Sequence, residues 1–248
     1  MADFMLPILA IRASEVPDRV VVVGDPARAT AIAERLDGGT QIGQNREYSS
    51  YLGSVDGVAV AVVSHGVGAA GAGVCFEELF RAGAQTVIRA GTAGALQDDV
   101  ADGSLVIATG AVREEGLSHR LVPDTFPAVA DADVLIALRT AVAAAGREPR
   151  CGLFLTNDLF YPHAPLGSSL ELWSMANVLA TEMEASALFV LASLHGRRAG
   201  SIAVIDGNPL RRDDQATTAY DPNRSVVNDG VGTMIDVVLA AIVAAPIG

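Results

Sequence analysis

Residues 19–36 read RVVVVGDPARATAIAERL, and this stretch decides the fold class. Its four consecutive valines predict a strand that is apolar on both faces, as in a parallel sheet covered by helices on each side. A glycine turn follows, and Pro26 then stands in the first turn of an alanine-rich helix, where its missing N–H costs nothing. The stretch therefore predicts a strand, a tight turn and a helix in succession, which is the repeating unit of an α/β domain.

Short β-branched runs alternate with alanine-rich stretches along the rest of the chain. The further strands that we expect are VAVAVVS from Val58, TVIRAG from Thr86, SLVIATG from Ser104, GLFLT from Gly152 and SIAVID from Ser201, and the expected helices span 26–36, 69–82, 133–145, 168–177, 184–195 and 226–244. Segments 114–132 and 207–223 are rich in Pro, Asp and Arg and are expected to be irregular. Loops of that length are usually functional. The pattern predicts an α/β fold with a mainly parallel sheet.

The charged residues exclude several classes of function. All 17 basic residues among the 248 are arginine, and 29 acidic residues give a net charge of -12. The absence of lysine excludes Schiff-base enzymes, pyridoxal-phosphate enzymes and Walker-type ATPases, because each depends on a lysine. The negative charge argues against sequence-independent binding to nucleic acid, which requires neutralisation of phosphates.

Cysteine and histidine are too few for a metal or disulfide scaffold. Two cysteines and four histidines, without a CxxC or HExxH motif, predict neither a disulfide framework nor a zinc site. The N-terminus lacks a basic start and a signal-length apolar core, and the apolar stretch 231–246 is interrupted by Asp236 and too short to cross a bilayer. We therefore expect a cytoplasmic protein without a membrane partner.

Three of the expected strands end in glycine-rich turns: GDPAR from Gly24, SHGVGAAGAG from Ser64 and RAGTAGAL from Arg89. Ligands bind at such turns in open α/β sheets, because glycine lets backbone N–H groups approach an anion. Arg28 and Arg89 accompany two of the turns, and NREY supplies Arg46. Guanidinium groups bind phosphate oxygens in pairs. A single turn of this kind, however, is more often only a tight connection.

The second turn also contains the pattern G-x-G-x-x-G, formed by Gly66, Gly68 and Gly71, which is a dinucleotide-binding fingerprint. That interpretation needs an acidic residue at the end of the next strand to hold a ribose. The next strand ends instead in Arg89 and glycine, and the fingerprint falls on a middle strand. A dinucleotide enzyme is therefore disfavoured.

Acidic residues of the C-terminal half stand where strands end or helices begin. In TEMEASALF, Glu182 and Glu184 are two residues apart, so in an extended segment both point to one side and can accept hydrogen bonds from ribose hydroxyls. The alternative is a helix start, where the macrodipole favours acids. Asp206 ends SIAVID, as a general acid or as a turn residue. Phe160 and Tyr161 either stack on a base or pack in the core.

Seven motifs follow one another along the chain: GDPAR, NREY, SHGVG, RAGTAGAL, DLFY, TEMEA and VID. In this order they resemble the nucleoside phosphorylase-I family, and the chain is similar to its hexameric purine nucleoside phosphorylases, above all those of protozoan parasites. The resemblance extends from about residue 20 to the C-terminal helix. It implies one domain over residues 1–248, with a twisted, mixed and largely parallel central sheet flanked by helices, and a homo-hexamer built as a trimer of dimers.

The resemblance also implies an activity, the reversible phosphorolysis of purine nucleosides to the free base and ribose 1-phosphate, with inorganic phosphate as co-substrate and neither cofactor nor metal. The implied phosphate-binding residues are Gly24, Arg28, Arg89 and Thr92, with Arg46 reaching the phosphate of a neighbouring subunit across the dimer interface. The implied nucleoside-binding residues are Met183 and Glu184 at the ribose, with Val67, Phe160 and Glu182 along the base and sugar pocket. Asp206 is implied to protonate the purine at N7.

The chain departs from the family pattern at two places. Ile8 stands where the family usually carries a histidine for the neighbour's ribose 5′-hydroxyl, so we expect 5′-deoxy and 5′-methylthio nucleosides to be accepted. Arg211 and Arg212 follow Pro209, near a position where the parasite enzymes carry an aromatic residue. The resemblance implies no role for these two arginines or for Arg224.

Three other functions remain open. Uridine phosphorylases carry a glutamine and an arginine shortly after FYP, whereas residues 163–166 here are HAPL, and Asp206 stands where those enzymes tend to carry an aliphatic residue; purine is therefore favoured. A hydrolytic nucleosidase of the same fold would have no phosphate for Arg28, Arg46 and Arg89. A non-catalytic nucleoside-binding protein would keep the pocket without turnover.

Overall fold

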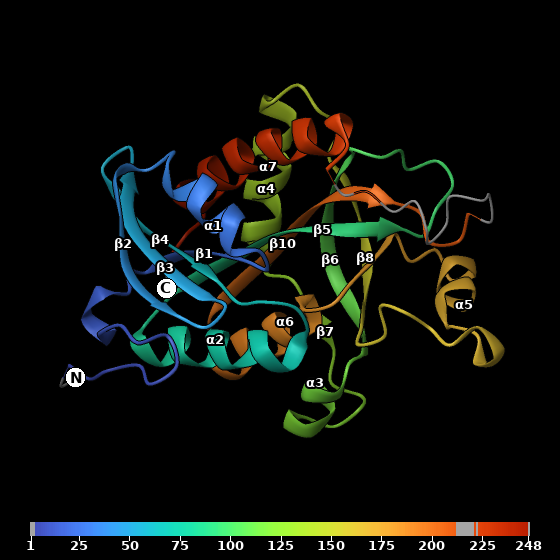
Figure 1. Cartoon of the computed structure of the whole chain (residues 1–248), viewed down its shortest axis with the longest axis horizontal. Coiled ribbons are helices and arrows are strands. Elements are labelled where there is room, and N and C mark those ends of the chain that lie inside the picture. The colour runs from blue at the N-terminus through green and yellow to red at the C-terminus, as the bar shows by residue number, and fades with distance from the viewer. Residues whose placement is uncertain (1–2, 212–220, 222, 248) are drawn as a thin grey trace.

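The computed structural model describes residues 3–211, 221 and 223–247, in which ten strands form one mixed sheet between helices (Figure 1). The strands are β1 (Arg19–Val23), β2 (Asp37–Asn45), β3 (Tyr48–Val55), β4 (Val58–Ser64), β5 (Thr86–Ala95), β6 (Leu105–Glu114), β7 (Ala128–Val129), β8 (Arg150–Asn157), β9 (Ala180–Glu182) and β10 (Arg198–Gly207). The helices are α1 (Pro26–Ala33), α2 (Ala69–Ala82), α3 (Gly116–Leu121), α4 (Ala132–Ala144), α5 (Leu170–Met175), α6 (Ala185–Leu194) and α7 (Ser225–Ala244). The expected α/β fold class is confirmed.

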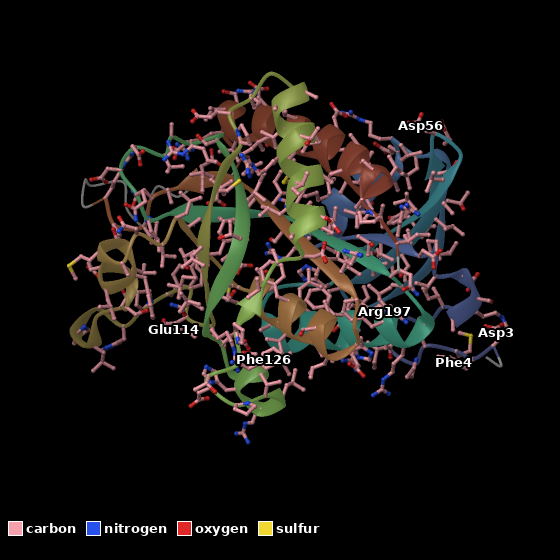
Figure 2. All side chains as sticks on the ribbon, turned by 180° about the vertical axis from the view of Figure 1, so that it is seen from behind. Asp3, Phe4, Asp56, Glu114, Phe126 and Arg197 are labelled. Carbon is pink, nitrogen blue, oxygen red and sulfur yellow. The ribbon has the colours of Figure 1, made fainter. Side chains whose placement is uncertain are left out.

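Helices cover both faces of the sheet. α2 and α6 pack on one face, and α1, α4 and α7 pack on the other (Figure 1). Val20 and Val22 of β1 belong to the first core, whereas Val21 and Val23 belong to the second, and all four are fully buried. Side chains fill both layers when the molecule is seen from behind (Figure 2). Burial on both faces explains why the strands are continuously apolar.

α7 is long and apolar enough, by length and composition alone, to cross a membrane. Half of that apolar window is buried inside the domain. Val227, Met234, Val238 and Ile242 lie in the core between the sheet and α4. α7 therefore has the burial of a core helix.

The parallel part of the sheet consists of the strands that the sequence predicts. β4, β1, β5 and β10 pair in this order in parallel, and β6 pairs in parallel with β8. Antiparallel pairing enters through the β2–β3 hairpin beside β4, through β7 and β9, and through the pair of β10 with β6. Five pairings are parallel and five antiparallel, counting the β8–β9 pair, and the sheet is mixed, as expected.

Five of the strands together form a closed ring. β5 pairs with β10, β10 with β6, β6 with β8, β8 with β9, and β9 with β5, so the hydrogen-bonded ladder returns to its start. The closing strand β9 is only three residues long, and its last residue is Glu182. The ring thus joins the strands that carry Arg89, Glu182 and Asp206.

The strands that the sequence does not predict are β2, β3, β7 and β9, of which β7 and β9 are only two and three residues long. β2 has no alternating apolar residues and is mostly exposed, and its pairing with β3 determines its strand state. Segment 114–132, expected to be irregular, contains α3 and β7, and Glu115 caps α3 by accepting the Ser118 N–H at 2.9 Å. Glu114 (Figure 2) accepts from Trp173 Nε1 at 2.6 Å, which ties α5 to the end of β6. The expected helices 26–36 and 168–177 are shorter than predicted.

Candidate active site

A cavity of about 730 Å³ opens where β1, β4, β5 and β10 end. Parallel strands that end at one edge of a sheet bring the turns that follow them together, and this is where α/β proteins bind ligands. The predicted site residues that line the cavity are Gly24, Arg28, Val67, Arg89, Thr92, Phe160, Glu182, Met183, Glu184 and Asp206. Among the predicted residues, only Arg46 lies elsewhere.

Arg89 is a buried cation in the wall of this cavity. It stands on β5 and is 4% exposed. Its Nη2 donates to Glu184 Oε2, and its Nη1 lies 3.3 Å from Glu182 Oε2. Its Nε and Nη1 have no hydrogen-bond acceptor among the described residues. A Cβ at Gly91 would come within 2.6 Å of Nη1, so glycine at this position leaves the space that the guanidinium occupies.

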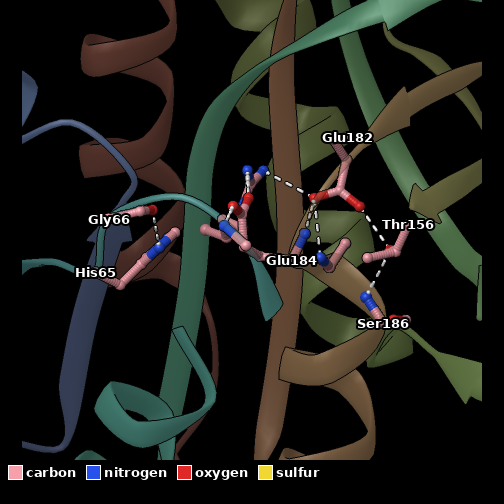
Figure 3. Close-up of polar contacts among 9 residues, drawn as sticks. His65, Gly66, Thr156, Glu182, Glu184 and Ser186 are labelled. Atoms are coloured by element: carbon pink, nitrogen blue, oxygen red, sulfur yellow. Dashed lines mark hydrogen bonds and ion pairs between the residues drawn. The ribbon is translucent and has the colours of Figure 1, made fainter. Parts of the chain in front are cut away.

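Glu182 has partners on every side (Figure 3). Its Oε1 accepts from Thr156 Oγ1 at 2.6 Å, and its Oε2 accepts the backbone N–H groups of Glu184 and Ala185 at 2.8 and 2.9 Å. The same oxygen faces Arg89. Glu182 therefore caps the first turn of α6 and positions the guanidinium, so its oxygens are already used inside the protein.

Glu184 has fewer partners. One oxygen accepts from Arg89, and the other accepts the Gly68 N–H at 2.6 Å. Both carboxylates thus contact the same guanidinium, as expected for alternate residues of an extended segment. The N–H from the glycine turn after β4 brings that turn against the start of α6.

The charge states of these three groups follow from burial and mutual attraction. Burial raises the pKa of Glu182, and the attraction of Arg89 does not fully offset it. Burial acts in the same direction on Glu184, but Arg89 and the Gly68 N–H hold the pKa of Glu184 below its ordinary value. Burial lowers the pKa of Arg89, whereas Glu184 and Glu182 raise it above the ordinary value. The site therefore holds a charged guanidinium beside one firmly ionised carboxylate.

The turns after β1 and β4 are joined backbone to backbone. The His65 N–H donates to Val23 O at 2.8 Å, and the Gly66 N–H donates to Gly24 O at 3.0 Å. Gly66 and Gly68 have φ values of 72° and 95°, which favour glycine. His65 is fully buried, its Nδ1 donates to Gly66 O at 2.9 Å (Figure 3), and burial lowers the pKa of His65 to about 4, so the ring is neutral.

Asp206 is the next-to-last residue of β10 and is 6% exposed. Arg224 Nη2 donates to its backbone oxygen at 2.8 Å, and Arg224 Nη1 pairs with Asp102 at 2.7 Å. Arg224 and Asp102 also line the cavity, and sequence reasoning missed both because their partners come from distant segments. Arg211 lines the cavity as well, whereas Arg212 lies outside the described residues.

Phe160 and Tyr161 lie at the cavity and not in the core. They are 55% and 74% exposed, and their rings meet edge to face with centroids 4.8 Å apart. Asp158 accepts the Gly116 N–H at 2.8 Å, which fixes the start of this segment against α3. The exposure of both rings favours the base-stacking interpretation over core packing.

Arg46 lies exposed at the tip of the β2–β3 hairpin, with a φ of 54°. Its neighbour Asn45 donates from Nδ2 to Ile8 O at 2.8 Å. Glu78 of α2 accepts the Ile8 and Leu9 N–H groups at 2.9 and 2.8 Å. The two positions that the family resemblance assigns to a neighbouring subunit therefore belong to one structural unit, and neither residue lines the cavity of its own chain.

The known proteins that resemble this chain belong to one family but differ in the nucleoside that their names give as substrate. A family model described as the phosphorylase superfamily matches residues 18–243. Guanosine phosphorylase from Halorubrum lacusprofundi is 37% identical over 238 residues, which cover 96% of this chain and 98% of the relative. Uridine phosphorylase from Treponema pallidum is 38% identical over 213 residues, which cover 82% and 83%. The crystal structure of purine nucleoside phosphorylase from Toxoplasma gondii in complex with immucillin-H has a TM-score of 0.92 and 33% identity, covering 98% of this chain and 97% of that one.

Proposed function

The chain belongs to the phosphorylase superfamily, and from this premise we propose that it is a pentosyltransferase that cleaves purine nucleosides reversibly with inorganic phosphate, as a single domain over residues 1–248. The observation that carries the proposal is the buried Arg89, held between Glu182 and Glu184 where the glycine turns after β1 and β4 meet the glycine-rich second half of β5. A site for phosphate and ribose side by side needs a cation and a carboxylate in contact, and this pairing supplies both.

Phosphate is proposed to bind between Gly24, Arg28, Arg89 and Thr92, without any further cofactor. All four residues line the cavity. The Nε and Nη1 of Arg89 lack acceptors among the described residues, and an unsatisfied buried donor costs about 1–3 kcal/mol. Phosphate oxygens would satisfy these donors, so part of the affinity for phosphate would come from this relief.

The ribose is proposed to lie against Met183 with its hydroxyls on Glu184. The ionised state of Glu184, which Arg89 maintains, makes it an acceptor only. When phosphate accepts hydrogen bonds from the guanidinium of Arg89, the hydrogen bond from Arg89 to Glu184 weakens. Glu184 can then accept hydrogen bonds from the ribose hydroxyls. Phosphate and nucleoside should therefore strengthen each other's binding. Glu182, with its oxygens engaged, acts in this proposal as a positioning residue.

The chemical step divides between the phosphate and Asp206. The C1′–N9 bond breaks with its electron pair leaving on the base, and a phosphate oxygen forms the new bond to C1′. The developing positive charge on the ribose faces phosphate and Glu184. Asp206 donates a proton to N7 of the leaving purine, which is worth roughly 10²–10⁴ in rate. Arg224, bonded to the Asp206 backbone oxygen, holds the end of β10 in place.

The assignment of purine over uracil rests on Asp206, a carboxylic acid that lines the cavity near the end of β10. The test is a panel of inosine, guanosine, adenosine and uridine, each assayed with and without phosphate. We expect phosphate-dependent release of purine bases. Preferential turnover of uridine would make the purine assignment wrong and leave the family unchanged, and full turnover without phosphate would establish a hydrolase.

We further propose a hexamer in which Arg46 completes the phosphate site of a neighbouring subunit, because Arg46 is exposed and does not line its own cavity. Mixing two impaired variants, Arg46→Ala and Arg89→Met, after reversible dissociation tests this directly when the activity is measured at limiting phosphate. A site shared across a dimer should regain about a quarter of the native activity, because one site of each mixed dimer has both arginines. No recovery in verified mixed oligomers contradicts the shared site.

A further inference from the structure

Asn208 carries an unused hydrogen-bond donor at the cavity. It lies two residues beyond Asp206, in the turn that follows β10, and lines the same cavity. Its Oδ1 accepts the Leu210 N–H at 2.9 Å, and its backbone oxygen accepts the Arg211 N–H at 3.2 Å. Its Nδ2 is buried and has no acceptor in the part of the chain that the structure describes. Buried amide donors are rarely left without a partner, because the desolvation cost is not recovered.

The orientation of this amide is fixed by the turn. Rotating the amide by 180° would place its NH₂ group against the Leu210 N–H, donor against donor, and would lose that hydrogen bond. Pro209 holds the turn on β5, since a Cβ at Gly94 would come to 3.0 Å from Pro209 Cδ. Asn208 therefore belongs to the wall of the cavity with its amide oriented by the turn, two residues after the proposed proton donor Asp206.

Two donors, one from Asp206 and one from Asn208, correspond in their hydrogen-bonding chemistry to one edge of a purine. Guanine and hypoxanthine present two acceptors side by side on this edge, N7 and O6, whereas adenine presents N7 beside an N6 amino donor. Asp206 donates to N7 in the function proposed above. The neighbouring group on a 6-oxopurine is an acceptor that the Asn208 amide can satisfy. On adenine it is a second donor, which leaves the amide unpaired.

We propose that Asn208 is a specificity-determining residue that donates from Nδ2 to O6 of the base and selects 6-oxopurine nucleosides over 6-aminopurine nucleosides. This inference rests on the proposed purine phosphorolysis. A site built to hydrogen-bond a substrate group discriminates strongly against an analogue that leaves its buried polar group unpaired, so the preference of kcat/KM for inosine over adenosine is expected to be roughly 100-fold or more.

Two substitutions separate the donor from its structural role. Asn208→Asp keeps an oxygen for the Leu210 N–H and removes the donor, whereas Asn208→Ala removes both. The measurement is kcat/KM for inosine and adenosine at saturating phosphate, together with the affinity for free hypoxanthine and adenine by calorimetry. We expect both variants to lose most of the preference for inosine, and Asn208→Asp to favour adenosine because its carboxylate accepts from the N6 amino group.

Asn157 provides the matched control. Its Oδ1 accepts the Leu159 N–H in a turn of the same kind, and it lines the same cavity. Asn157→Asp adds the same negative charge to the wall and should change both nucleosides alike. The inference is overturned if Asn208→Ala loses kcat/KM equally for inosine and adenosine while Asn208→Asp keeps the native values. That result would show that Asn208 only shapes the turn. An equal shift of the ratio in Asn157→Asp would overturn the inference too.

The same assay separates this inference from the proposed function. If the native protein cleaves both inosine and adenosine with phosphate at equal kcat/KM, the phosphorylase function stands and the role of Asn208 is wrong. If the native protein cleaves no purine nucleoside with phosphate, the proposed function itself is wrong. Unchanged unfolding temperatures in both Asn208 variants confirm that the comparison concerns the folded protein.

Discussion

Replacing Arg89 with methionine leaves two buried carboxylates without their shared cation. Glu182 keeps its hydroxyl donor Thr156 and two backbone donors, whereas Glu184 keeps only the Gly68 N–H. Removing one partner of a buried ion pair costs about 3–5 kcal/mol, because the remaining charge is no longer compensated. For a chain of this length each kcal/mol lowers the unfolding temperature by about 2–4 °C, so the expected decrease is roughly 6–20 °C.

The size of this decrease should depend on pH through Glu184. Arg89 holds the pKa of Glu184 below its ordinary value in the native protein. Glu184 therefore adds stability above its unfolded pKa, and this contribution is lost as the pH falls through the folded pKa. Without Arg89, burial raises the pKa of Glu184. Protonation of Glu184 at lower pH therefore removes the uncompensated buried charge and makes the variant less unstable. The difference between native and variant unfolding temperatures should shrink from about pH 7.5 to about pH 5.

Thermal unfolding by calorimetry and circular dichroism measures both effects. The double variant Arg89→Met/Glu184→Gln removes the uncompensated charge and should recover part of the lost stability without recovering turnover. Arg81→Met is the control, because Arg81 pairs with Glu77 on the surface and is 66% exposed, and such pairs contribute less than about 1 kcal/mol. An Arg89→Met protein that unfolds within about two degrees of the native protein at every pH would refute this account of the buried pair.

Three further predictions concern the chemistry. Asp206→Asn should lower purine turnover by roughly 10²–10⁴ while nucleoside affinity measured by calorimetry changes little; unchanged turnover would remove Asp206 from the mechanism. If Ile8 takes the place of the family's histidine, as the resemblance implies, kcat/KM for 5′-deoxyinosine should stay within about a hundredfold of that for inosine, and a larger loss, above about 2.7 kcal/mol, contradicts this prediction. Arg46→Ala should raise KM for phosphate at an unchanged unfolding temperature, since Arg46 is exposed at a hairpin tip; an unchanged KM would place Arg46 outside the phosphate site.

The apolar runs and glycine turns predict most of the fold because their signals are local. RVVVVGDPAR already contains a strand, a turn and a helix start, and the structure places each there. β2 and β9 escape prediction because nothing in DGGTQIGQN or ATE requires an extended backbone. Their strand state comes from partners that are distant in sequence, β3 for one and β5 and β8 for the other.

The same distinction applies to the site. Glu184 and Asp206 are predictable because one precedes a helix and the other stands near the end of a strand, where ligands bind. Arg89 is predictable from the glycine-rich RAGTAGAL, but the turn expected there is wrong, because these residues continue β5 as far as Ala95. The use that the protein makes of Glu182 is not predictable, because its donors come from β8 and α6 at once. Asn208 carries no sequence signal either, since its importance lies in a donor that lacks a partner.

The closed ring of β5, β10, β6, β8 and β9 has a consequence for how this protein can change. In an open sheet, a residue inserted into an edge strand can bulge toward the side of that strand that has no partner strand. β5 has no such free side, because it pairs with β10 and β9 in the ring and with β1 outside it, so one inserted or deleted residue in β5 disturbs these ladders together and turns alternate side chains to the opposite face. The β2–β3 tip faces no such constraint. New substrate preferences should therefore arise by substitution within the ring and by length change only in the turns that leave it.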